Sequence, residues 1–277
     1  MINSELQNKL RQQFNPDGSE IRRYQLRILD ILKYIDRICR ENNIRYWASS
    51  GTCLGAIRHA GFIPWDDDAD IEMTYDDFKR FKKAVKKDSD PNFVFYDHEI
   101  DNEYVTQFPK ITDLRPFDFT NKHYDIITMY HKYQGPFVDI FPIMPSNSHK
   151  LNFISGKIQG LFLFRLNHIS NKRLRIALKR IIYFVLHNIA FPLLRRLENL
   201  FVKNKFRHIS GVGFTIPRNK KDIDSTIYVK FEDTTIPVPV NYDSYLKLLF
   251  GDYNNLPDPS IIEMHAIDFT PDQTHKE

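Results

Sequence analysis

The sequence predicts a mixed α/β (α+β) fold, in which helices flank a mixed sheet and a basic helical segment is inserted in the second half. Short strand-like segments alternate with amphipathic helical segments through short connections, and after Pro145 a long basic and apolar stretch replaces this alternation. The chain has 277 residues, of which 42% are hydrophobic, so it can bury a sizeable core. A wholly disordered chain is therefore excluded.

The boundaries of the predicted elements follow from hydrophobic periodicity and from turn residues. Residues 21–43 keep a helical spacing of apolar side chains, with charges on the opposite face. Residues 75–87 also predict a helix, because Thr74 is a good N-cap and two aspartates occupy the first turn. We expect strands at 45–49, 69–73, 92–96, 104–111 and 137–141, a short helix at 52–59, a hairpin from 228–231 and 235–240, and a final helix at 242–250.

Changes in composition along the chain divide it into four segments. Residues 1–19 are predicted to be a flexible N-terminal segment, and residues 20–149 form the first part of the core. Residues 150–209 are the basic helical insert. Residues 210–277 return to the α/β pattern and complete the core domain, with a frayed end from Thr270.

Composition excludes several classes of protein. Two cysteines, Cys39 and Cys53, cannot form a disulfide scaffold or a four-thiolate zinc site, and their placement is typical of a reduced cytosolic protein. Residues 1–15 lack the apolar core of a secretory signal. The longest strongly apolar run, 181–194, is shorter than a membrane span, so we expect no conventional transmembrane helix and a cytoplasmic location.

Charge is distributed unevenly along the chain. Residues 150–207 contain 13 basic residues and one acidic residue, Glu198, whereas acids exceed bases in the rest of the chain. This asymmetry indicates an anionic partner for the insert. Two interpretations remain open: basic amphipathic helices that lie peripherally on the inner face of an anionic cytoplasmic membrane, and a helical subdomain that packs over the active site with a solvated basic rim.

The densest group of chemically active side chains consists of Asp66, Asp67, Asp68 and Asp70. Four carboxylates within five residues repel one another unless a positive charge lies among them. On a strand, Asp68 and Asp70 point the same way, which suits Mg²⁺, with Mn²⁺ as the alternative ion. A solvated acidic turn is the other interpretation, but the large apolar neighbours Trp65 and Ile71 favour a pocket.

A glycine-containing turn precedes these acids. Gly51 and Gly55 allow close backbone approach, and a helix that begins near Thr52 presents free N–H groups to a phosphate. Arg58 and His59 are candidate side-chain donors to the same phosphate. The alternative is that the glycines only form a tight turn.

A third carboxylate occurs within the apolar segment 137–141. A buried and unpaired Asp139 is costly, which makes it a natural third metal ligand beside Asp68 and Asp70. Lys110 is a further polar candidate, for which a surface position is an equal alternative.

The block from Gly51 to Asp70 reads Gly-Thr-Cys-Leu-Gly-Ala-Ile-Arg-His, then Gly-Phe-Ile-Pro-Trp, then Asp-Asp-Asp-Ala-Asp. It resembles the LicD family of phosphocholine transferases, relatives of the fukutin-type ribitol-phosphate transferases, which have a nucleotidyltransferase fold. Segments 108–113, 135–142 and 228–253 also resemble family blocks. The insert lies where such proteins vary most, so the resemblance implies nothing about its role.

The resemblance implies transfer of phosphocholine or a similar phospho-alcohol group from a CDP-linked donor to a hydroxyl of a cell-surface glycan or glycolipid, with release of CMP. Lipopolysaccharide and teichoic acid are the expected kinds of acceptor. For a choline donor, Trp47 and Trp65 are candidates for an aromatic cage. The implied roles are Mg²⁺ binding by Asp68, Asp70 and Asp139, donor binding by Gly51, Thr52, Arg58, His59, Lys110 and Trp65, and acceptance of the acceptor's proton by Asp66, Asp67 or Asp139.

Two other functions are considered. A true nucleotidyltransferase would take CTP or another nucleoside triphosphate and release pyrophosphate, which the spacing of the acids permits. A nucleic-acid-binding protein is less favoured, because no recognised binding motif is present and the acidic site repels a phosphate backbone. No nucleic-acid partner is therefore expected.

Overall fold

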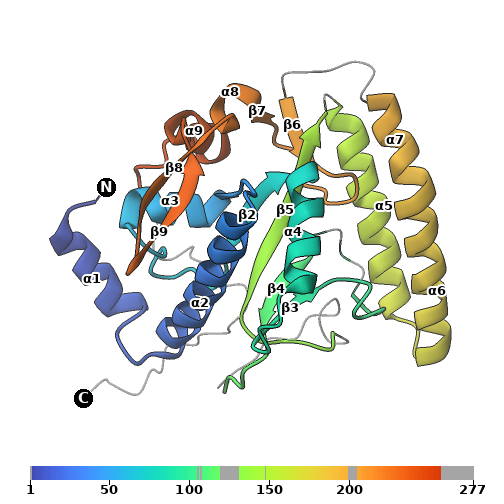
Figure 1. Cartoon of the computed structure of the whole chain (residues 1–277), viewed down its shortest axis with the longest axis horizontal. Helices are drawn as coiled ribbons and strands as arrows, with labels where there is room; N and C mark the ends of the chain where they lie inside the picture. The colour runs from blue at the N-terminus through green and yellow to red at the C-terminus, as the bar shows by residue number, and fades with distance from the viewer. Residues whose placement is uncertain are drawn as a thin grey trace.

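The computed structural model describes residues 2–104, 106, 108–118, 131–146, 148–198 and 205–256. Its centre is a mixed sheet with the strand order β1-β2-β5-β4-β3, which β6 and β7 extend from the far end of β5 (Figure 1). Within this sheet β2 and β5 are parallel, and the other pairs are antiparallel. The mixed α/β fold predicted from the sequence is confirmed.

The strands of the large sheet are β1 (Trp47–Ala48), β2 (Asp70–Thr74), β3 (Phe93–Tyr96), β4 (Lys110–Asp113), β5 (Phe137–Pro145), β6 (Lys205–His208) and β7 (Arg218–Asn219). A separate hairpin is formed by β8 (Thr226–Phe231) and β9 (Thr234–Pro239). The helices of the core are α1 (Ser4–Phe14), α2 (Glu20–Glu41), α3 (Ser50–His59), α4 (Tyr75–Lys87), α8 (Lys220–Ile223) and α9 (Tyr242–Phe250). The insert contains α5 (His149–Asn167), α6 (Lys172–Val185), the π-helical turn η1 (Leu186–Ala190) and α7 (Phe191–Glu198).

Local sequence determines several of these boundaries. Helix α4 begins after Thr74, whose hydroxyl accepts a hydrogen bond from the backbone N–H of Asp77 at 3.2 Å. Helix α2 buries one apolar face from Ile21 to Ile38 in the main core and keeps most of its charges outside. The predicted bounds of α4 and α9 are confirmed to the residue.

Two expectations about strands require correction. The strand expected at 104–111 is limited to β4, because the Tyr104 hydroxyl donates to the carbonyl of Phe108 and Pro109 has no N–H for a ladder. Strand β5 continues through Pro142 to Pro145, since β2 and β6 pair along both of its edges.

The N-terminal segment expected to be flexible contains helix α1, which packs on the core. The ring of Phe14 contacts Trp65 at a centroid distance of 5.1 Å, and Asn15 donates to Gln25 at 2.7 Å. The frayed end predicted from Thr270 lies outside the described residues.

Helices α2 and α4 lie on the same side of the sheet (Figure 1). At one edge of the molecule, α6 and α7 follow one another in line, and α5 lies beside them. The helical nature of the insert is thus confirmed. The main hydrophobic core lies between α2, α3, α4 and the sheet, so that the acidic loop before β2 is held close to α2 and α3.

Candidate active site

A cavity of about 530 Å³ brings together the three carboxylates that the sequence singles out as metal ligands. Asp70 begins β2 and Asp139 lies near the start of β5, and the two residues are partners in the parallel register. The backbone N–H of Asp139 donates to the carbonyl of Ala69 at 2.9 Å. The lining residues are Ser50, Asp68, Asp70, Asp139, His208, Thr215, Arg218, Gly213 and the apolar side chains Phe108, Phe141, Phe214, Ile216, Leu249 and Phe250.

Asp66, Asp70 and Asp139 are buried in a crowded acidic region, so their ionised forms are disfavoured. Burial, followed by the charges of Asp68 and Asp139, holds the pKa of Asp70 well above its usual value. Burial together with the charges of Asp68 and Asp67 does the same for Asp66. Burial raises the pKa of Asp139 to about 6, although Lys110 opposes this rise.

Lys110 partly compensates this negative charge. Its ammonium group lies 3.2 Å from Oδ1 of Asp139 and 3.2 Å from the centroid of the Phe137 ring. Lys110 is not among the residues that line the cavity, so it holds Asp139 rather than reaching a ligand there. One lysine does not balance three carboxylates, and the charge of the cavity therefore suits a cation.

The three predicted metal ligands share a cavity but do not form a complete metal site by themselves. Among the described residues, no group of three or more histidine, cysteine, aspartate or glutamate side chains is arranged to hold a metal ion. Asp68, Asp70 and Asp139 thus share one cavity without forming a preformed three-carboxylate cage. This arrangement fits the usual binding of Mg²⁺, in which one or two carboxylates are joined by water and substrate phosphates.

The glycine-containing turn supports the aspartates directly. The Thr52 hydroxyl accepts a hydrogen bond from the backbone N–H of Asp70 at 2.8 Å. A Cβ atom at Gly51 would lie 2.9 Å from Oδ2 of Asp66, so only glycine lets the carboxylate come this close. The Thr52 hydroxyl thus positions Asp70, and Ser50, two residues earlier, lines the cavity.

Three predicted donor-binding residues lie away from the cavity. Arg58 is buried and donates to the carbonyl of Tyr253 at 2.9 Å and to Nε2 of His59 at 2.9 Å. Burial and the Arg58 charge lower the pKa of His59 to about 3, and its Nδ1 bonds Gln7 at 2.7 Å. Trp65 packs between Phe14 and His59.

Contacts with other parts of the chain hold these three residues away from the cavity. Gln7 and Phe14 of α1 contact His59 and Trp65, and the carbonyl of Tyr253, after α9, accepts a hydrogen bond from Arg58.

Asp66 and Asp67 also lie behind the cavity, since neither is among its lining residues. Asp67 is 1% exposed, and the backbone carbonyl of Asp66 accepts a hydrogen bond from Gln25 of α2 at 2.8 Å. Of the three carboxylates considered as proton acceptors, Asp139 is thus the one that reaches the cavity.

A fourth carboxylate, Glu72, is the main feature that sequence reasoning missed. Glu72 is fully buried on β2 and accepts hydrogen bonds from Trp47 at 3.0 Å and from Tyr245 at 3.2 Å, in addition to its contacts with two cavity-lining residues. Arg218 donates to Glu72 at 2.6 Å, and Nε2 of His208 lies 3.0 Å from the same oxygen.

These contacts fix the charge of Glu72. Burial alone would raise its pKa, but the Arg218 charge and the His208 hydrogen bond outweigh burial and hold the pKa well below its usual value. The alternating sequence Asp68, Asp70, Glu72 is the signal that could have indicated this residue, because i and i+2 share a face of a strand. Trp47, considered for an aromatic cage, is instead 0% exposed behind the site.

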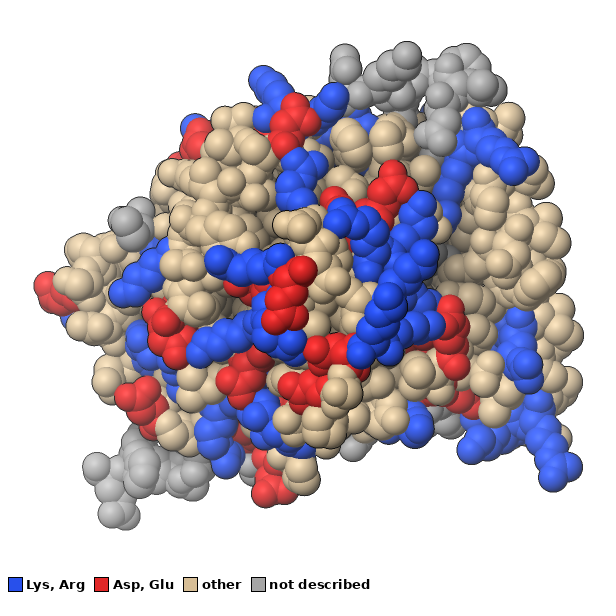
Figure 2. Space-filling view, viewed as in Figure 1, with Lys and Arg blue, Asp and Glu red and all other residues tan. Residues whose placement is uncertain are grey.

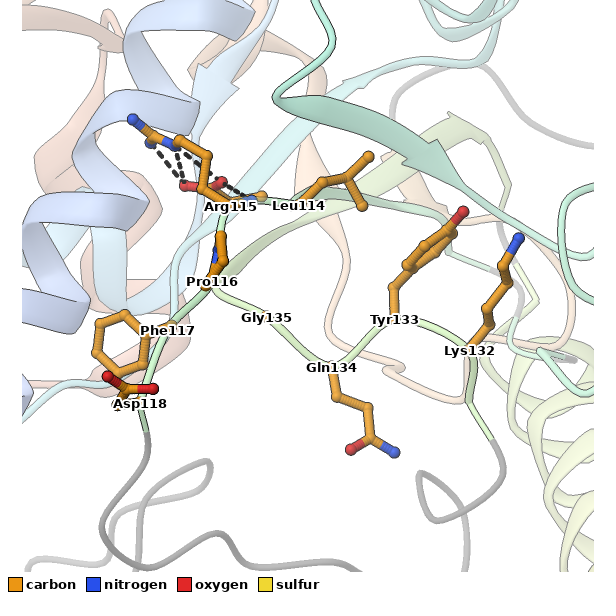
Figure 3. A pocket seen from close by; sticks show the side chains of 10 residues that line it. Leu114, Arg115, Pro116, Phe117, Asp118, Lys132, Tyr133, Gln134 and Gly135 are labelled. Carbon is orange, nitrogen blue, oxygen red and sulfur yellow. Dashed lines mark hydrogen bonds and ion pairs between the residues drawn. The ribbon is translucent and has the colours of Figure 1, made fainter.

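A second cavity of about 620 Å³ is lined by residues 113–118 and 132–135 (Figure 3). Asp113 at its edge accepts hydrogen bonds from Arg27 at 2.6 Å and from Arg115 at 2.6 Å. Because this carboxylate is already neutralised, the cavity lacks the unbalanced charge of the first one.

Comparison with known proteins finds a family match that includes the block from Gly51 to Asp70. Residues 43–170 match the family model described as LicD/FKTN/FKRP, nucleotidyltransferase domain. The resemblance to the LicD family that the sequence indicates is confirmed. The matched part includes Ser50, Asp68, Asp70 and Asp139, and therefore the carboxylates of the cavity.

Individual relatives differ in how much of the chain they cover. The lipopolysaccharide cholinephosphotransferase LicD of Haemophilus influenzae is 27% identical over 264 residues, which are 89% of this chain and 96% of that protein. The ribitol 5-phosphate transferase FKRP of Homo sapiens is 38% identical over 45 residues, or 16% of this chain and 9% of that protein. The ribitol-5-phosphate transferase FKTN of Mus musculus is 25% identical over 100 residues, or 36% of this chain and 19% of that protein.

Proposed function

We propose that this transferase of the LicD family moves a phospho-alcohol group, phosphocholine or a similar one, from a CDP-linked donor to a hydroxyl of a cell-surface glycan and releases CMP. The observation that carries the proposal is the convergence of Asp68, Asp70 and Asp139 on one cavity, in a chain that matches the LicD family across those residues. Phosphoryl transfer depends mainly on positioning and charge neutralisation, which such a site supplies.

The proposal assigns separate roles to the three carboxylates. Asp68 lies in the loop that leads into β2 and Asp70 is the first residue of that strand. Both would hold Mg²⁺, whose charge would neutralise the donor's phosphate oxygens. Asp139 reaches the cavity from β5 and would accept the proton of the acceptor hydroxyl, since a carboxylate with a pKa of about 6 is a better base than an ordinary aspartate. Lys110 holds Asp139 at the cavity.

Two further residues suit the donor. Arg218 and His208 line the cavity, and Glu72 fixes both from behind. A guanidinium held by a buried carboxylate keeps its orientation, so Arg218 would offer its remaining N–H groups to an incoming phosphate in a fixed geometry. The apolar lining from Phe108 to Phe250 excludes water from the reacting phosphate.

A test measures CMP and pyrophosphate separately. The purified full chain is incubated with Mg²⁺ and CDP-choline, CDP-ribitol, CDP-glycerol or CTP, with and without crude glycolipid. We expect CMP from one CDP-linked donor, loss of at least about a hundredfold in rate in Asp70→Asn, and little change in Asp17→Asn, an exposed aspartate outside the cavity. Pyrophosphate from CTP without CMP would instead show a nucleotidyltransferase and overturn the proposal.

A further inference from the structure

The helices of the insert bury polar side chains and expose apolar ones, which is the reverse of a helix in a water-soluble core. Apolar side chains are normally the ones withdrawn from water. Here the insert's buried polar and charged residues are Asn152, Ser155, Gln159 and Asn167 on α5, and Arg175 and Lys179 on α6. The exposed apolar side chains of the insert therefore do not form part of a conventional hydrophobic core.

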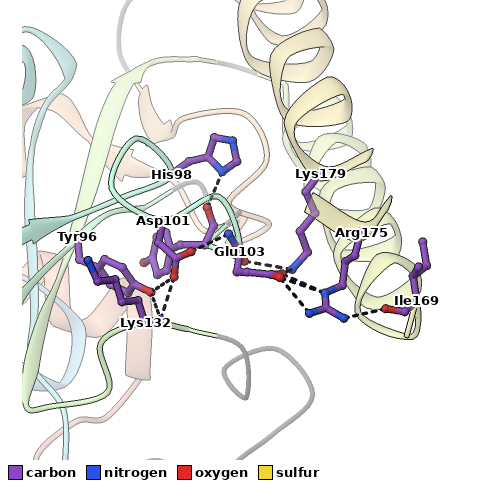
Figure 4. Close-up of polar contacts among 9 residues, drawn as sticks. Tyr96, His98, Asp101, Glu103, Lys132, Ile169, Arg175 and Lys179 are labelled. Carbon is purple, nitrogen blue, oxygen red and sulfur yellow. Dashed lines mark hydrogen bonds and ion pairs between the residues drawn. The ribbon is translucent and has the colours of Figure 1, made fainter. Parts of the chain in front are cut away.

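The polar inner face attaches the insert to the protein body. Asn152 donates to the carbonyl of His208 at 2.9 Å, and Ser155 accepts from the backbone N–H of Gly211 at 2.9 Å. On α6, Arg175 and Lys179 both point at Glu103, at 3.0 and 2.6 Å (Figure 4). These buried contacts leave the opposite side of the helices without a partner in the described part of the chain.

The outer side of α6, η1 and α7 carries a continuous apolar stripe. The stripe residues are separated by helical intervals of three, four or seven positions and place large side chains on one side of the rod. Ile181 and Phe184 are 60% and 58% exposed. The other members are Leu174, Val185, Ile189, Leu193 and Leu197. We call these residues together the insert face.

Positive charge surrounds this apolar surface. No acidic residue occurs between 148 and 197, and the exposed bases there are Lys150, Lys157, Arg165, Lys172, Arg173, Arg180 and Arg196. Figure 2 shows a largely uncharged surface along the edge formed by α6 and α7, with blue side chains gathered toward its two ends. A patch that is apolar in the middle and basic around it is complementary to lipid with anionic headgroups.

The structure argues against two other occupants. Lys172–Leu197 is long and apolar enough to cross a membrane by length and composition. However, Arg175 and Lys179 join α6 to Glu103 of the body, and the uncharged stretch between Arg180 and Arg195 is about 21 Å long, less than the roughly 30 Å of a hydrocarbon core. A second copy packed face to face would bring the same bases together without acids to pair with them.

We propose that the insert face lies on an anionic membrane surface, with its apolar stripe at the level of the headgroups and its bases on anionic lipids. The inner side of the insert adjoins the cavity, because a Cβ atom on Gly156 of α5 would lie 2.3 Å from Cα of Gly213, which lines the cavity. The membrane inference does not depend on the proposed reaction.

Binding to vesicles tests the inference. The full chain is sedimented with vesicles of equal parts phosphatidylglycerol and phosphatidylcholine, or of phosphatidylcholine alone, in low and high salt. We expect binding to the anionic vesicles only, weakened in high salt. Lys172→Gln/Arg173→Gln/Arg180→Gln should weaken binding on the order of 100-fold, since each base near the surface contributes about fivefold.

Matched variants separate charge, apolar contact and misfolding. The triple variant Lys9→Gln/Lys83→Gln/Lys87→Gln removes three exposed bases outside the insert and should bind like the wild type. Ile181→Ser/Phe184→Ser should weaken binding at least tenfold while keeping the circular dichroism spectrum, because both side chains already face solvent. Equal binding to both vesicle types, no binding to either, or a dimer in light scattering that Ile181→Ser/Phe184→Ser disperses would overturn the proposal.

Depth is tested by labelling. Ile181→Cys can be labelled selectively with an environment-sensitive fluorophore because the native Cys39 and Cys53 are both buried. Shallow quenchers in the anionic vesicles should quench this label more than quenchers at the bilayer centre. The reverse order would indicate a spanning helix and overturn the interfacial placement.

Discussion

Replacing Asp139 by asparagine should stabilise the metal-free protein at pH 8 while abolishing transfer. Burial and the charge of Asp68 raise the pKa of this carboxyl from 3.8 to about 6. A shift of about two units corresponds to ~3 kcal/mol, by which the fold disfavours the ionised form relative to the unfolded chain. This figure is already net of the Lys110 ion pair, because the pKa of about 6 includes the lowering effect of Lys110.

The expected gain at pH 8 is therefore ~3 kcal/mol, or about 6 °C in Tm for a chain of this size. The gain depends on pH with a definite sign. Because the folded-state pKa of Asp139 is raised, its stabilising contribution is complete below pH 3.8 and is lost as the pH rises through about 6. Asp139→Asn should therefore exceed the wild type in Tm at pH 8 and lose most of this advantage at pH 4.5.

The assay is thermal unfolding in EDTA at both pH values, with Asp17→Asn as the control for an exposed aspartate. A variant that is destabilised by the same amount at pH 8 and pH 4.5 would refute the reasoning. Such a result would mean that Asp139 is held by favourable contacts rather than forced into a crowded negative site.

Three other variants and one ligand address the remaining features. Mg²⁺ at about 100 times its Kd should raise the unfolding free energy of the wild type by ~2.7 kcal/mol at pH 8 and leave the Tm of Asp70→Asn unchanged in scanning fluorimetry. Glu103→Gln leaves the two buried cations of α6 without a counter-charge and should cost about 3–5 kcal/mol in urea unfolding, whereas a loss below 1 kcal/mol would contradict this role. Gly61→Ala would place a Cβ 2.3 Å from Oε1 of Glu232 and should cost about 1–3 kcal/mol in the same assay. Because the pKa of Glu72 lies below its usual 4.5, its contribution is present above that pH and is lost in acid; Glu72→Gln should flatten the acid limb of a Tm–pH profile, and an unchanged limb would be inconsistent with the network.

Sequence reasoning succeeded where the determining interaction is local. Thr74 caps its own helix three residues later, and the acidic block specifies the turn and strand that carry Asp68 and Asp70. These interactions span a few residues, so the pattern of side chains contains most of the information.

Reasoning from sequence failed where distant segments decide the outcome. In the sequence, Arg58 resembles a hydrogen-bond donor to a phosphate. In the structure it donates to the carbonyl of Tyr253, 195 residues away. In the sequence, Glu72 resembles any other strand residue. In the structure Arg218 neutralises its charge and Tyr245 donates a hydrogen bond to it, so that Glu72 holds Arg218 in the cavity wall. Tertiary contacts of this separation leave no periodic signal in one sequence.

The contact between Gly156 and Gly213 connects α5 directly to the wall of the cavity. The backbones of the two residues meet without intervening side chains, and Gly213 has a positive φ of 85°, so the contact has little room to absorb displacement. Phe214 follows directly and lines the cavity. We therefore expect a tilt of the insert to move the Phe214 ring in the cavity. The orientation of the protein on a membrane surface would then affect the shape of the cavity.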